Sequence, residues 1–182
     1  MSAEAIRRAI ALLRAGRPIR ISGAEGLTVA SVETMTPELL DARDPQRGAA
    51  LLISGHRAAA LKLANERDAA DPHAPVVIER APWLDTTGAA ALIDPGRDLD
   101  RGPTGPLHAI NSGCGEAAAA ALALARNAGL LPALWLLEPQ ETDAAVSIDD
   151  VRREQTQPSL EIVARAKLPL DGLPPTKIVA FQ

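Results

Sequence analysis

The chain has 182 residues, of which 47% are hydrophobic, and a formal net charge of -4 at pH 7. These values are typical of one globular domain, with room for at most a small appendage. The weak acidity gives no electrostatic basis for binding nucleic acid or an anionic membrane. A single cysteine excludes a disulfide framework and a conventional zinc site, and it suits a reducing cytoplasm.

The apolar runs are much shorter than the roughly 20 residues that a membrane-spanning helix requires. The N-terminus also differs from a signal peptide, because Glu4, Arg7 and Arg8 lie within its helical pattern. We therefore expect a cytoplasmic protein that binds neither nucleic acid nor a membrane.

In chain order, the first half predicts helices alternating with short strands. Ile6, Ala9, Ile10 and Leu13 recur at the spacing of a helical stripe, which ends at Gly16. The elements expected after it are strands Pro18–Ile21 and Leu27–Val32 as a hairpin, a short helix from Thr36 to Ala42, strand Ala49–Ile53, helix Gly55–Leu63 and strand Pro75–Ile78.

Glycine, proline, aspartate and threonine are frequent between Ala81 and Gly105, which predicts a loop with at most one helical turn at Ala89–Ile93. Pro106–Ile110 is expected to form a strand. From Glu116 to Ala128 an alanine-rich helix is predicted, ended by Gly129, and Ala133–Leu137 follows as a fully apolar strand. This helix and strand are the expected centre of a layered α/β core.

The end of the chain is more polar. We expect an α/β domain over residues 1–138, a polar connector over 139–159 with a short strand at Ala144–Ile148, and a β-rich arm over 160–182. The arm consists of the runs Leu160–Leu168 and Lys177–Phe181, separated by prolines.

Few residues suggest chemistry by themselves. Gly113-Cys114-Gly115-Glu116 resembles a glycine loop that binds an anion at a helix N-terminus, but Glu116 would repel a phosphate, so a flexible helix entry is the simpler interpretation. Cys114 has no histidine near it in sequence to activate its thiol. The acidic and basic residues of Asp94–Arg101 suggest a solvated loop or the mouth of a cleft.

The three histidines, His56, His73 and His108, lack the paired spacing of a metal-binding helix. We expect His56 at the start of a helix, His73 in a loop and His108 in a strand. No nucleophile paired with a base, no phosphate-binding loop and no metal cage is evident.

Several stretches are similar to 3,4-dihydroxy-2-butanone-4-phosphate synthase, a riboflavin-pathway enzyme that releases formate from ribulose 5-phosphate. They are Ile6–Arg17, Glu25–Glu33 followed by Thr36-Pro37-Glu38, Leu51–Ile53 with Arg57-Ala58, Pro106–Ala109, and Leu124–Leu130 with Pro132-Ala133 and Glu138. The resemblance implies an α+β fold, layered as in α/β proteins, in which helices pack on a mixed, twisted sheet.

The chain departs from that family at the metal-binding residues. The family's acidic loop reads Arg-Glu-Asn-Glu-Gly-Asp, and here its positions hold Ser22, Gly23, Ala24, Glu25, Gly26 and Leu27. Its first glutamate, a ligand of Mg²⁺, is thus replaced by Gly23. The histidine of its Gly-His-Thr-Glu motif falls on Ala117, or on Cys114 if the helix contains an insertion. Because the reaction needs the metal to polarise a carbonyl, we expect no metal, no cofactor and no synthase activity.

Val163–Pro169 and Ile178–Phe181 resemble the opening strands of GTP cyclohydrolase II, which follows a synthase-like domain in many bacteria. One hypothesis is therefore a non-catalytic scaffold that dimerises, or that positions or regulates a GTP cyclohydrolase II domain; its partners would be a second copy or that domain. The alternative is an enzyme acting on a sugar phosphate or nucleotide. Its rebuilt site would draw on the weak candidates Glu25, His108, Cys114, Glu116 and Glu138.

Overall fold

The computed structural model describes residues 2–63, 67–99, 105–155, 162–169, 171–172, 174 and 176–181. The chain divides into two compact units, Met1–Arg152 and Arg153–Gln182. None of the helices in the described ranges combines the length and apolarity that crossing a membrane requires.

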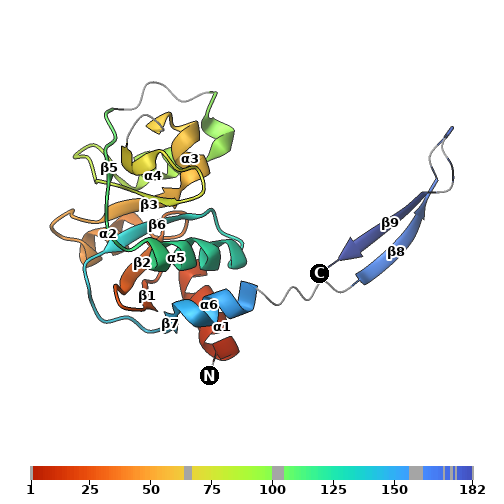
Figure 1. The fold of residues 1–182 in the computed structure, drawn as a ribbon, viewed down its shortest axis with the longest axis horizontal. Coiled ribbons are helices and arrows are strands. Elements are labelled where there is room, and N and C mark those ends of the chain that lie inside the picture. The colour runs from red at the N-terminus through yellow and green to blue at the C-terminus, as the bar shows by residue number, and fades with distance from the viewer. Residues whose placement is uncertain are drawn as a thin grey trace. The chain divides into compact units, whose positions relative to one another are not determined.

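A seven-stranded sheet is the framework of the first unit, as far as its residues are described, with strand order β5-β4-β3-β6-β2-β1-β7 (Figure 1). Neighbouring strands are antiparallel except β1 and β7, which are parallel, so the sheet is mixed as predicted. The strands are β1 (Ile19–Ser22), β2 (Leu27–Ser31), β3 (Ala50–Ser54), β4 (Pro75–Ile78), β5 (Ala109–Ile110), β6 (Ala133–Leu137) and β7 (Ala145–Ser147).

Helices cover both faces of this sheet (Figure 1). One face packs against α1, α5 and α6, and the other against α2, α3 and α4. Their bounds are α1 (Ser2–Arg14), α2 (Pro37–Arg43), α3 (Gly55–Ala60), α4 (Thr86–Ile93), α5 (Gly115–Asn127) and α6 (Ile148–Gln155), with short 3-10 turns η2 (Arg67–Ala69) and η3 (Pro95–Arg97). The α+β class with layered helices is therefore confirmed.

The predicted centre of the core lies where the sequence placed it. Strand β6 pairs with β2 on one side and with β3 on the other. Helix α5 buries nearly every residue between Ala117 and Ala125, and its alanines let its backbone lie close to the sheet. After the helix, Gly129 adopts φ 68°, in the left-handed region that glycine occupies without strain, and the chain turns into β6.

Two local expectations were wrong. The segment read as loop contains the eight-residue helix α4, because Asp85 caps it: the Asp85 carboxylate accepts a hydrogen bond from the Gly88 N–H at 2.7 Å. Strand β5 is shorter than the predicted Pro106–Ile110, so His108 lies just before the strand.

The first unit extends beyond Glu138 into the segment predicted as a polar connector. Strand β7 pairs with β1 through Val146 and Ile21, and α6 buries Val151 completely against the same face as α1 and α5. The boundary between the two compact units falls inside α6, after Arg152.

The second unit contains an antiparallel hairpin of β8 (Ile162–Leu168) and β9 (Thr176–Phe181). Its strands agree with the two predicted β-rich runs, except that Leu160 and Glu161 lie outside the described residues. All of β8 is exposed, as is nearly all of β9. The hairpin pairing is regular apart from a shift between Ile162 and Ala164.

Candidate functional site

Three of the five candidate residues line one small hollow. The turn between β1 and β2 contributes Glu25, and the entry to α5 contributes Cys114 and Glu116, around a volume of about 120 Å³. Gly113 adopts φ 70°, and a Cβ atom there would lie 3.6 Å from Glu25 Oε2. Its left-handed conformation is one that glycine adopts without strain where the chain enters the helix.

The groups around this hollow are already engaged or open to water. The Cys114 thiol is buried and donates to the Ser112 hydroxyl at 2.8 Å. A hydroxyl is not a base that could generate a thiolate. Glu116 is 74% exposed and forms a 3.1 Å ion pair with Arg152 of α6. These contacts stabilise the entry to α5 without creating an evident nucleophile.

Glu138 and His108 do not line the hollow. Glu138 directly follows β6, whose last residue Leu137 pairs with Thr28 near the start of β2, so it lies at the same end of the sheet as the β1–β2 turn. Its side chain is exposed. His108 is exposed beside β5, which is separated from β6 by β3 and β4. Its backbone carbonyl accepts a hydrogen bond from Glu79 N–H at 3.0 Å.

The position that the resemblance assigns to the metal-binding glutamate, Gly23, lies beside a side chain from α6. A Cβ atom on Gly23 would lie 2.6 Å from Cδ1 of Ile148, the first residue of α6. Ile148 also lines the hollow with Glu25. In the described parts of the chain, no three His, Cys, Asp or Glu side chains gather closely enough to hold a metal ion. A carboxylate ligand at position 23 would therefore require the Ile148 side chain to move.

A second hollow, of about 310 Å³, lies beside the start of α3 and η3. Arg57 of this hollow makes three hydrogen bonds: its two terminal nitrogens each donate to the Asp98 carboxylate at 2.7 Å, and its Nε donates to the Leu92 carbonyl. The alternating charges of Asp94–Arg101 had suggested a solvated loop or a cleft mouth. Asp98 does line a hollow, whereas Asp100 and Arg101 lie outside the described residues.

The same region brings two histidines together that sequence spacing had left isolated. The rings of His56 and His73 make an edge-to-face contact with centroids 5.4 Å apart. His56 lies in the first turn of α3 and His73 in a loop, as predicted. Spacing along the chain could not reveal this contact, because it depends on the antiparallel pairing of β3 with β4.

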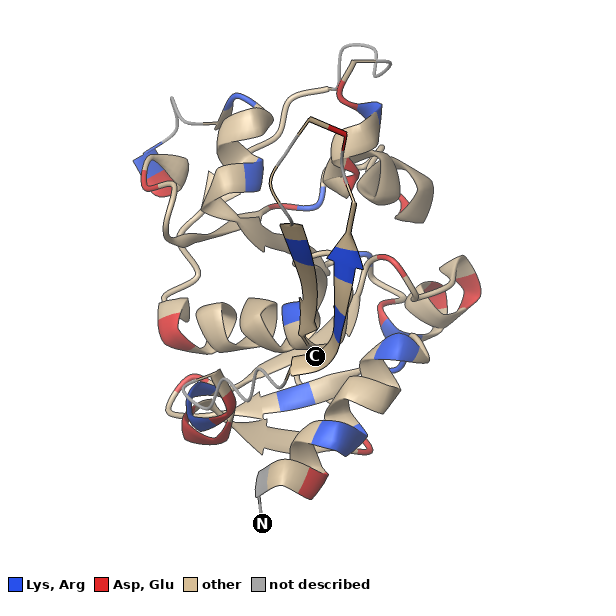
Figure 2. Ribbon diagram, turned by 90° about the vertical axis from the view of Figure 1, so that its right-hand side faces the viewer, with Lys and Arg blue, Asp and Glu red and all other residues tan. Residues whose placement is uncertain are grey.

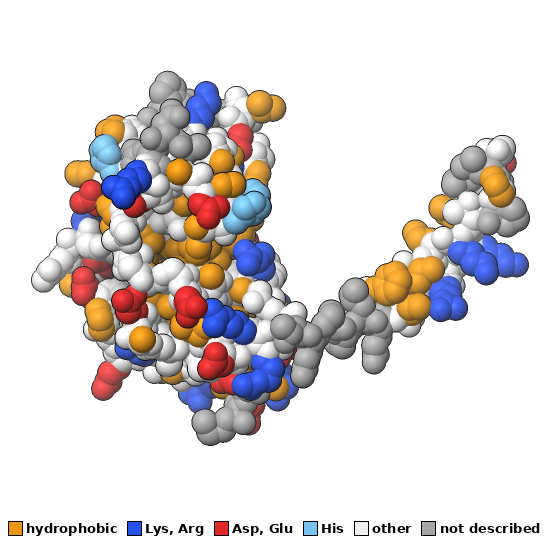
Figure 3. All heavy atoms as spheres, viewed as in Figure 1, with side chains coloured by type: hydrophobic (Ala, Val, Ile, Leu, Met, Phe, Trp, Pro, Cys, Tyr) orange, Lys and Arg blue, Asp and Glu red, His pale blue; other side chains and the backbone are white. Residues whose placement is uncertain are grey.

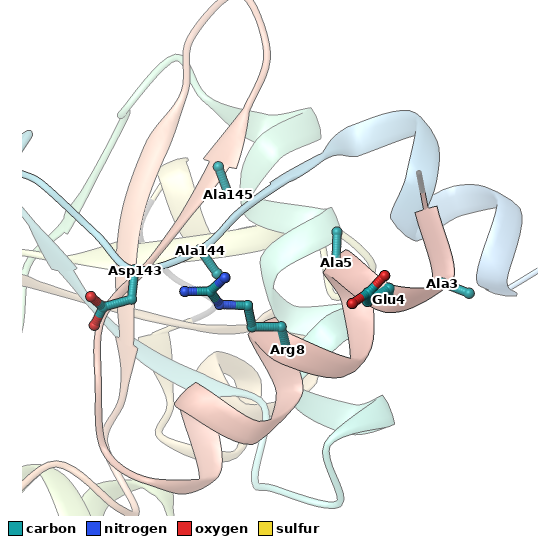
Figure 4. A pocket seen from close by; sticks show the side chains of 7 residues that line it. All are labelled: Ala3, Glu4, Ala5, Arg8, Asp143, Ala144 and Ala145. Carbon is teal, nitrogen blue, oxygen red and sulfur yellow. The ribbon is translucent and has the colours of Figure 1, made fainter.

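A wider hollow of about 690 Å³ lies between the start of α1 and the segment entering β7, away from every predicted residue (Figure 4). Ala3, Ala5, Ala144 and Ala145 form much of its wall. Of its charged residues, Asp143 already forms an ion pair with Arg17. The lining thus combines small methyl groups with the charged side chains of Glu4, Arg8 and Asp143.

The fold of this chain is similar to that of solved protein structures. No protein-family model and no curated protein matches this sequence. The structure of RibBX, a two-domain 3,4-dihydroxy-2-butanone 4-phosphate synthase from A. baumannii, is similar with a TM-score of 0.55 and 16% identity, over 97% of this chain and 66% of that one. The chain thus spans slightly less than two thirds of that protein.

A second solved structure is similar to this chain to the same degree. The structure of 3,4-dihydroxy-2-butanone 4-phosphate synthase of Candida albicans has a TM-score of 0.54 and 16% identity, over 84% of this chain and 97% of that one. At this identity the likeness concerns architecture alone. The chain therefore has the fold of the 3,4-dihydroxy-2-butanone 4-phosphate synthases.

Proposed function

We propose that this chain is a synthase-like domain without synthase activity, which acts in riboflavin biosynthesis as a scaffold, dimerisation or regulatory module for a GTP cyclohydrolase II activity. The observation that carries the proposal is the contact between Gly23 and Ile148. A carboxylate at position 23 would be needed to hold Mg²⁺, and here that position has no side chain, while a Cβ atom there would meet Cδ1 of Ile148 at 2.6 Å.

The size and chemistry of the hollow support the same conclusion. At about 120 Å³ it is well below the roughly 300 Å³ at which ligand pockets usually begin. Its carboxylates, Glu25 and Glu116, are exposed, and Glu116 is paired with Arg152. Enediol formation from a keto-phosphate requires a positioned base and an electrophile for the carbonyl, and these residues provide neither.

The link to a cyclohydrolase rests on the hairpin. Its strands match the runs that resemble the opening strands of GTP cyclohydrolase II, and the hairpin belongs to a compact unit of its own. A unit of two strands with exposed apolar side chains is suited to contact another protein surface.

The decisive experiment for lost catalysis is a formate-release assay. The purified chain is incubated with ribulose 5-phosphate and Mg²⁺, beside an active synthase at equal concentration as the positive control. We expect no formate above the no-enzyme blank. Turnover at about 1 per second or faster, the range of ordinary enzymes, would overturn the proposal.

The alternative enzyme reading has one observation in its favour, since Glu25, Cys114 and Glu116 do share a hollow. It predicts that a sugar phosphate or nucleotide binds there. Titrating ribulose 5-phosphate and GTP into the chain by calorimetry tests it, with Glu25→Gln as the matched variant. Binding that Glu25→Gln abolishes would favour the enzyme over the scaffold.

The partner role is tested separately. The chain is mixed with a GTP cyclohydrolase II protein, and the mass of the mixture is measured by light scattering after size exclusion. Formation of a stoichiometric complex, or a change in cyclohydrolase rate, is the expected result. An unchanged rate together with independent elution at high concentration would remove the cyclohydrolase part of the proposal.

A further inference from the structure

Another hollow of the first unit brings two arginines together. Its volume is about 390 Å³, and its described lining residues are Arg47, Arg80, Ala81 and Pro82. Arg47 belongs to the loop before β3, and Arg80 follows the end of β4. Because Leu51 near the start of β3 pairs with Ile78 at the end of β4, these two segments meet at the same end of the sheet.

The Arg80 guanidinium keeps an unused hydrogen-bond donor. Its Nε donates to the Leu84 carbonyl at 3.1 Å, and its Nη1 donates to the Asp44 carboxylate at 2.6 Å. Its other terminal nitrogen, Nη2, makes no hydrogen bond to a residue that the structure describes. The side chain is only 4% exposed, so these bonds and the surrounding packing fix its position. A fixed guanidinium with open N–H groups is a preorganised donor to an oxyanion.

Arg47 presents its cation at the same hollow from an unusual backbone conformation. Its φ is 57°, a left-handed value that non-glycine residues seldom adopt. Two hydrogen bonds to Asp44 hold the turn, from the Arg47 N–H to the carbonyl and from the Gly48 N–H to the carboxylate. Within the described ranges the Arg47 side chain forms no ion pair. Strained positions of this kind gather at functional sites.

Any attraction for an anion at this hollow is local. The chain as a whole has a net charge of -4. Positive and negative side chains are interspersed over the first unit, both along the ribbon in Figure 2 and on the face seen in Figure 3. At the hollow, Asp44 balances the charge of Arg80, whereas the charge of Arg47 is not balanced by another lining residue. The lining therefore carries a single uncompensated positive charge.

This charge favours a carboxylate over a phosphate. A carboxylate is planar, carries a single negative charge and matches the fork of a guanidinium. A phosphate monoester carries about -1.5 to -2 charges at pH 7, and Asp44 beside Arg80 repels it more strongly. Ala81 and Pro82 add an apolar wall that suits a short hydrocarbon part. The volume of about 390 Å³ lies within the roughly 300–1,000 Å³ of ligand pockets.

We propose that this hollow binds the carboxylate of a small organic acid between the Arg47 guanidinium and Nη2 of Arg80. The inference does not depend on the proposed scaffold role. Arg47 and Arg80 lie outside the stretches that resemble the synthases and outside the five candidate residues. A ligand held mainly by one carboxylate is expected to bind with a Kd of roughly 1 mM.

The binding test uses benzoate as the probe and the indole N–H of Trp135 as the reporter. Cζ of Arg80 lies 5.1 Å from the centre of the Trp135 ring, and the buried indole N–H has no hydrogen-bond partner in the described part of the chain. In nitrogen-15 NMR spectra of the full chain at constant ionic strength, benzoate should shift this signal saturably. Inorganic phosphate should bind more weakly. Trp83→Phe assigns the signal, because the chain has two tryptophans.

Two glycine substitutions test which cation matters. Arg47→Gly removes the charge without straining the turn, because glycine adopts a positive φ readily. It should keep the melting temperature within a few degrees and weaken benzoate binding by about tenfold or more. Lys62→Gly is the matched control, since Lys62 is also exposed and has a φ of 64° but does not line the hollow. It should leave the affinity unchanged.

Three results would each overturn the inference: no saturable shift with benzoate, equal affinities of the two glycine variants, or tighter binding of phosphate than of benzoate. The comparison of the two anions uses the wild-type chain, so it stands whatever the stability of the variants. None of these results bears on formate release, so failure here is distinguishable from failure of the proposed loss of catalysis.

Discussion

Arg80 donates from a terminal nitrogen to the Asp44 carboxylate at 2.6 Å, and the two side chains are only 4% and 6% exposed. The same carboxylate accepts hydrogen bonds from the Gly48 and Ala49 N–H groups, and the Arg80 guanidinium lies 5.1 Å from the centre of the Trp135 ring. One buried ion pair thus joins the loop before β3, the end of β4 and the central strand β6.

Removing one partner of this pair should destabilise the first unit strongly. Arg80→Met keeps the length of the side chain but leaves Asp44 buried without its cation, which typically costs about 3–5 kcal/mol. Urea denaturation followed by circular dichroism measures the loss. Arg97→Met is the matched control, because the Arg97–Asp94 pair is exposed and such pairs contribute about 0–1 kcal/mol. Equal losses for the two variants would show that the Asp44 pair is not buried.

A charge on the buried face of α5 should be severely destabilising. Ala121 is fully buried, so Ala121→Asp places an unpaired carboxylate in the core and should lower the free energy of unfolding by about 4 kcal/mol or more. Ala119→Asp is the control on the same helix, since Ala119 is exposed, and should cost less than about 1 kcal/mol. Melting temperatures that shift equally would mean that α5 is oriented differently.

The contact between Gly23 and Ile148 predicts a coupled pair. Gly23→Glu needs the Ile148 side chain to move, because the new Cβ would lie 2.6 Å from its Cδ1. Crowding of this kind costs about 1–3 kcal/mol, and the flexible end of the isoleucine favours the lower value. In an Ile148→Ala background the same substitution should cost less. A double-mutant cycle from thermal melts measures the coupling, and strictly additive losses would contradict the contact.

Glu38 in the first turn of α2 predicts a pH effect. Hydrogen bonds from its own backbone N–H, and secondly from the Thr36 hydroxyl, hold the pKa of the Glu38 carboxyl below its ordinary value. A carboxyl whose pKa is lower when folded stabilises the fold above its unfolded pKa, and this contribution disappears as the pH falls through the folded pKa. Thr36→Val should raise the Glu38 pKa in a carbon-13 NMR titration, whereas Thr36→Ser, which keeps the hydroxyl, should not.

Ending the chain after Ser159 should leave the first unit folded. The β8–β9 hairpin lies in a different compact unit, and the sheet and core helices are complete without it. The melting temperature of the shortened chain should therefore stay within a few degrees of the full chain. A cooperative loss of structure on truncation would mean that the terminal strands help to hold the central sheet.

The sequence was most informative where one local pattern determined the outcome. Ala133–Leu137 is uniformly apolar, which is the pattern expected of a strand whose sheet is covered by helices on both faces. Strand β6 has the same bounds. Thr36 and Pro37 predicted the start of α2, and the Thr36 hydroxyl does accept the Leu39 N–H.

Other elements could not be predicted because their stability comes from distant partners. Helix α6 is polar along most of its length and attaches through Val151, so its own sequence resembles a connector. The ion pairs of Arg57 with Asp98 and of Arg80 with Asp44 join residues 41 and 36 positions apart. Only the pairing of strands brings such residues together.

The sequence supplied five candidate residues for a site, and the structure places three of them, Glu25, Cys114 and Glu116, around one hollow, while their function stays a prediction. The sequence could not indicate Ile148, which reaches Gly23 from a segment expected to lie outside the domain.

The central place of β6 has a consequence for how this protein opens to solvent. Leu134, Trp135 and Leu136 of β6 each pair with β2 on one side and with β3 on the other, and α5 packs on the same sheet, so their amide protons should exchange with deuterium only when the whole first unit unfolds. Among the described residues β8 and β9 form a separate two-stranded sheet, and their amides should exchange through local fraying. Hydrogen exchange rates along the chain should therefore form two distinct populations, with the slowest set reporting the global free energy of unfolding.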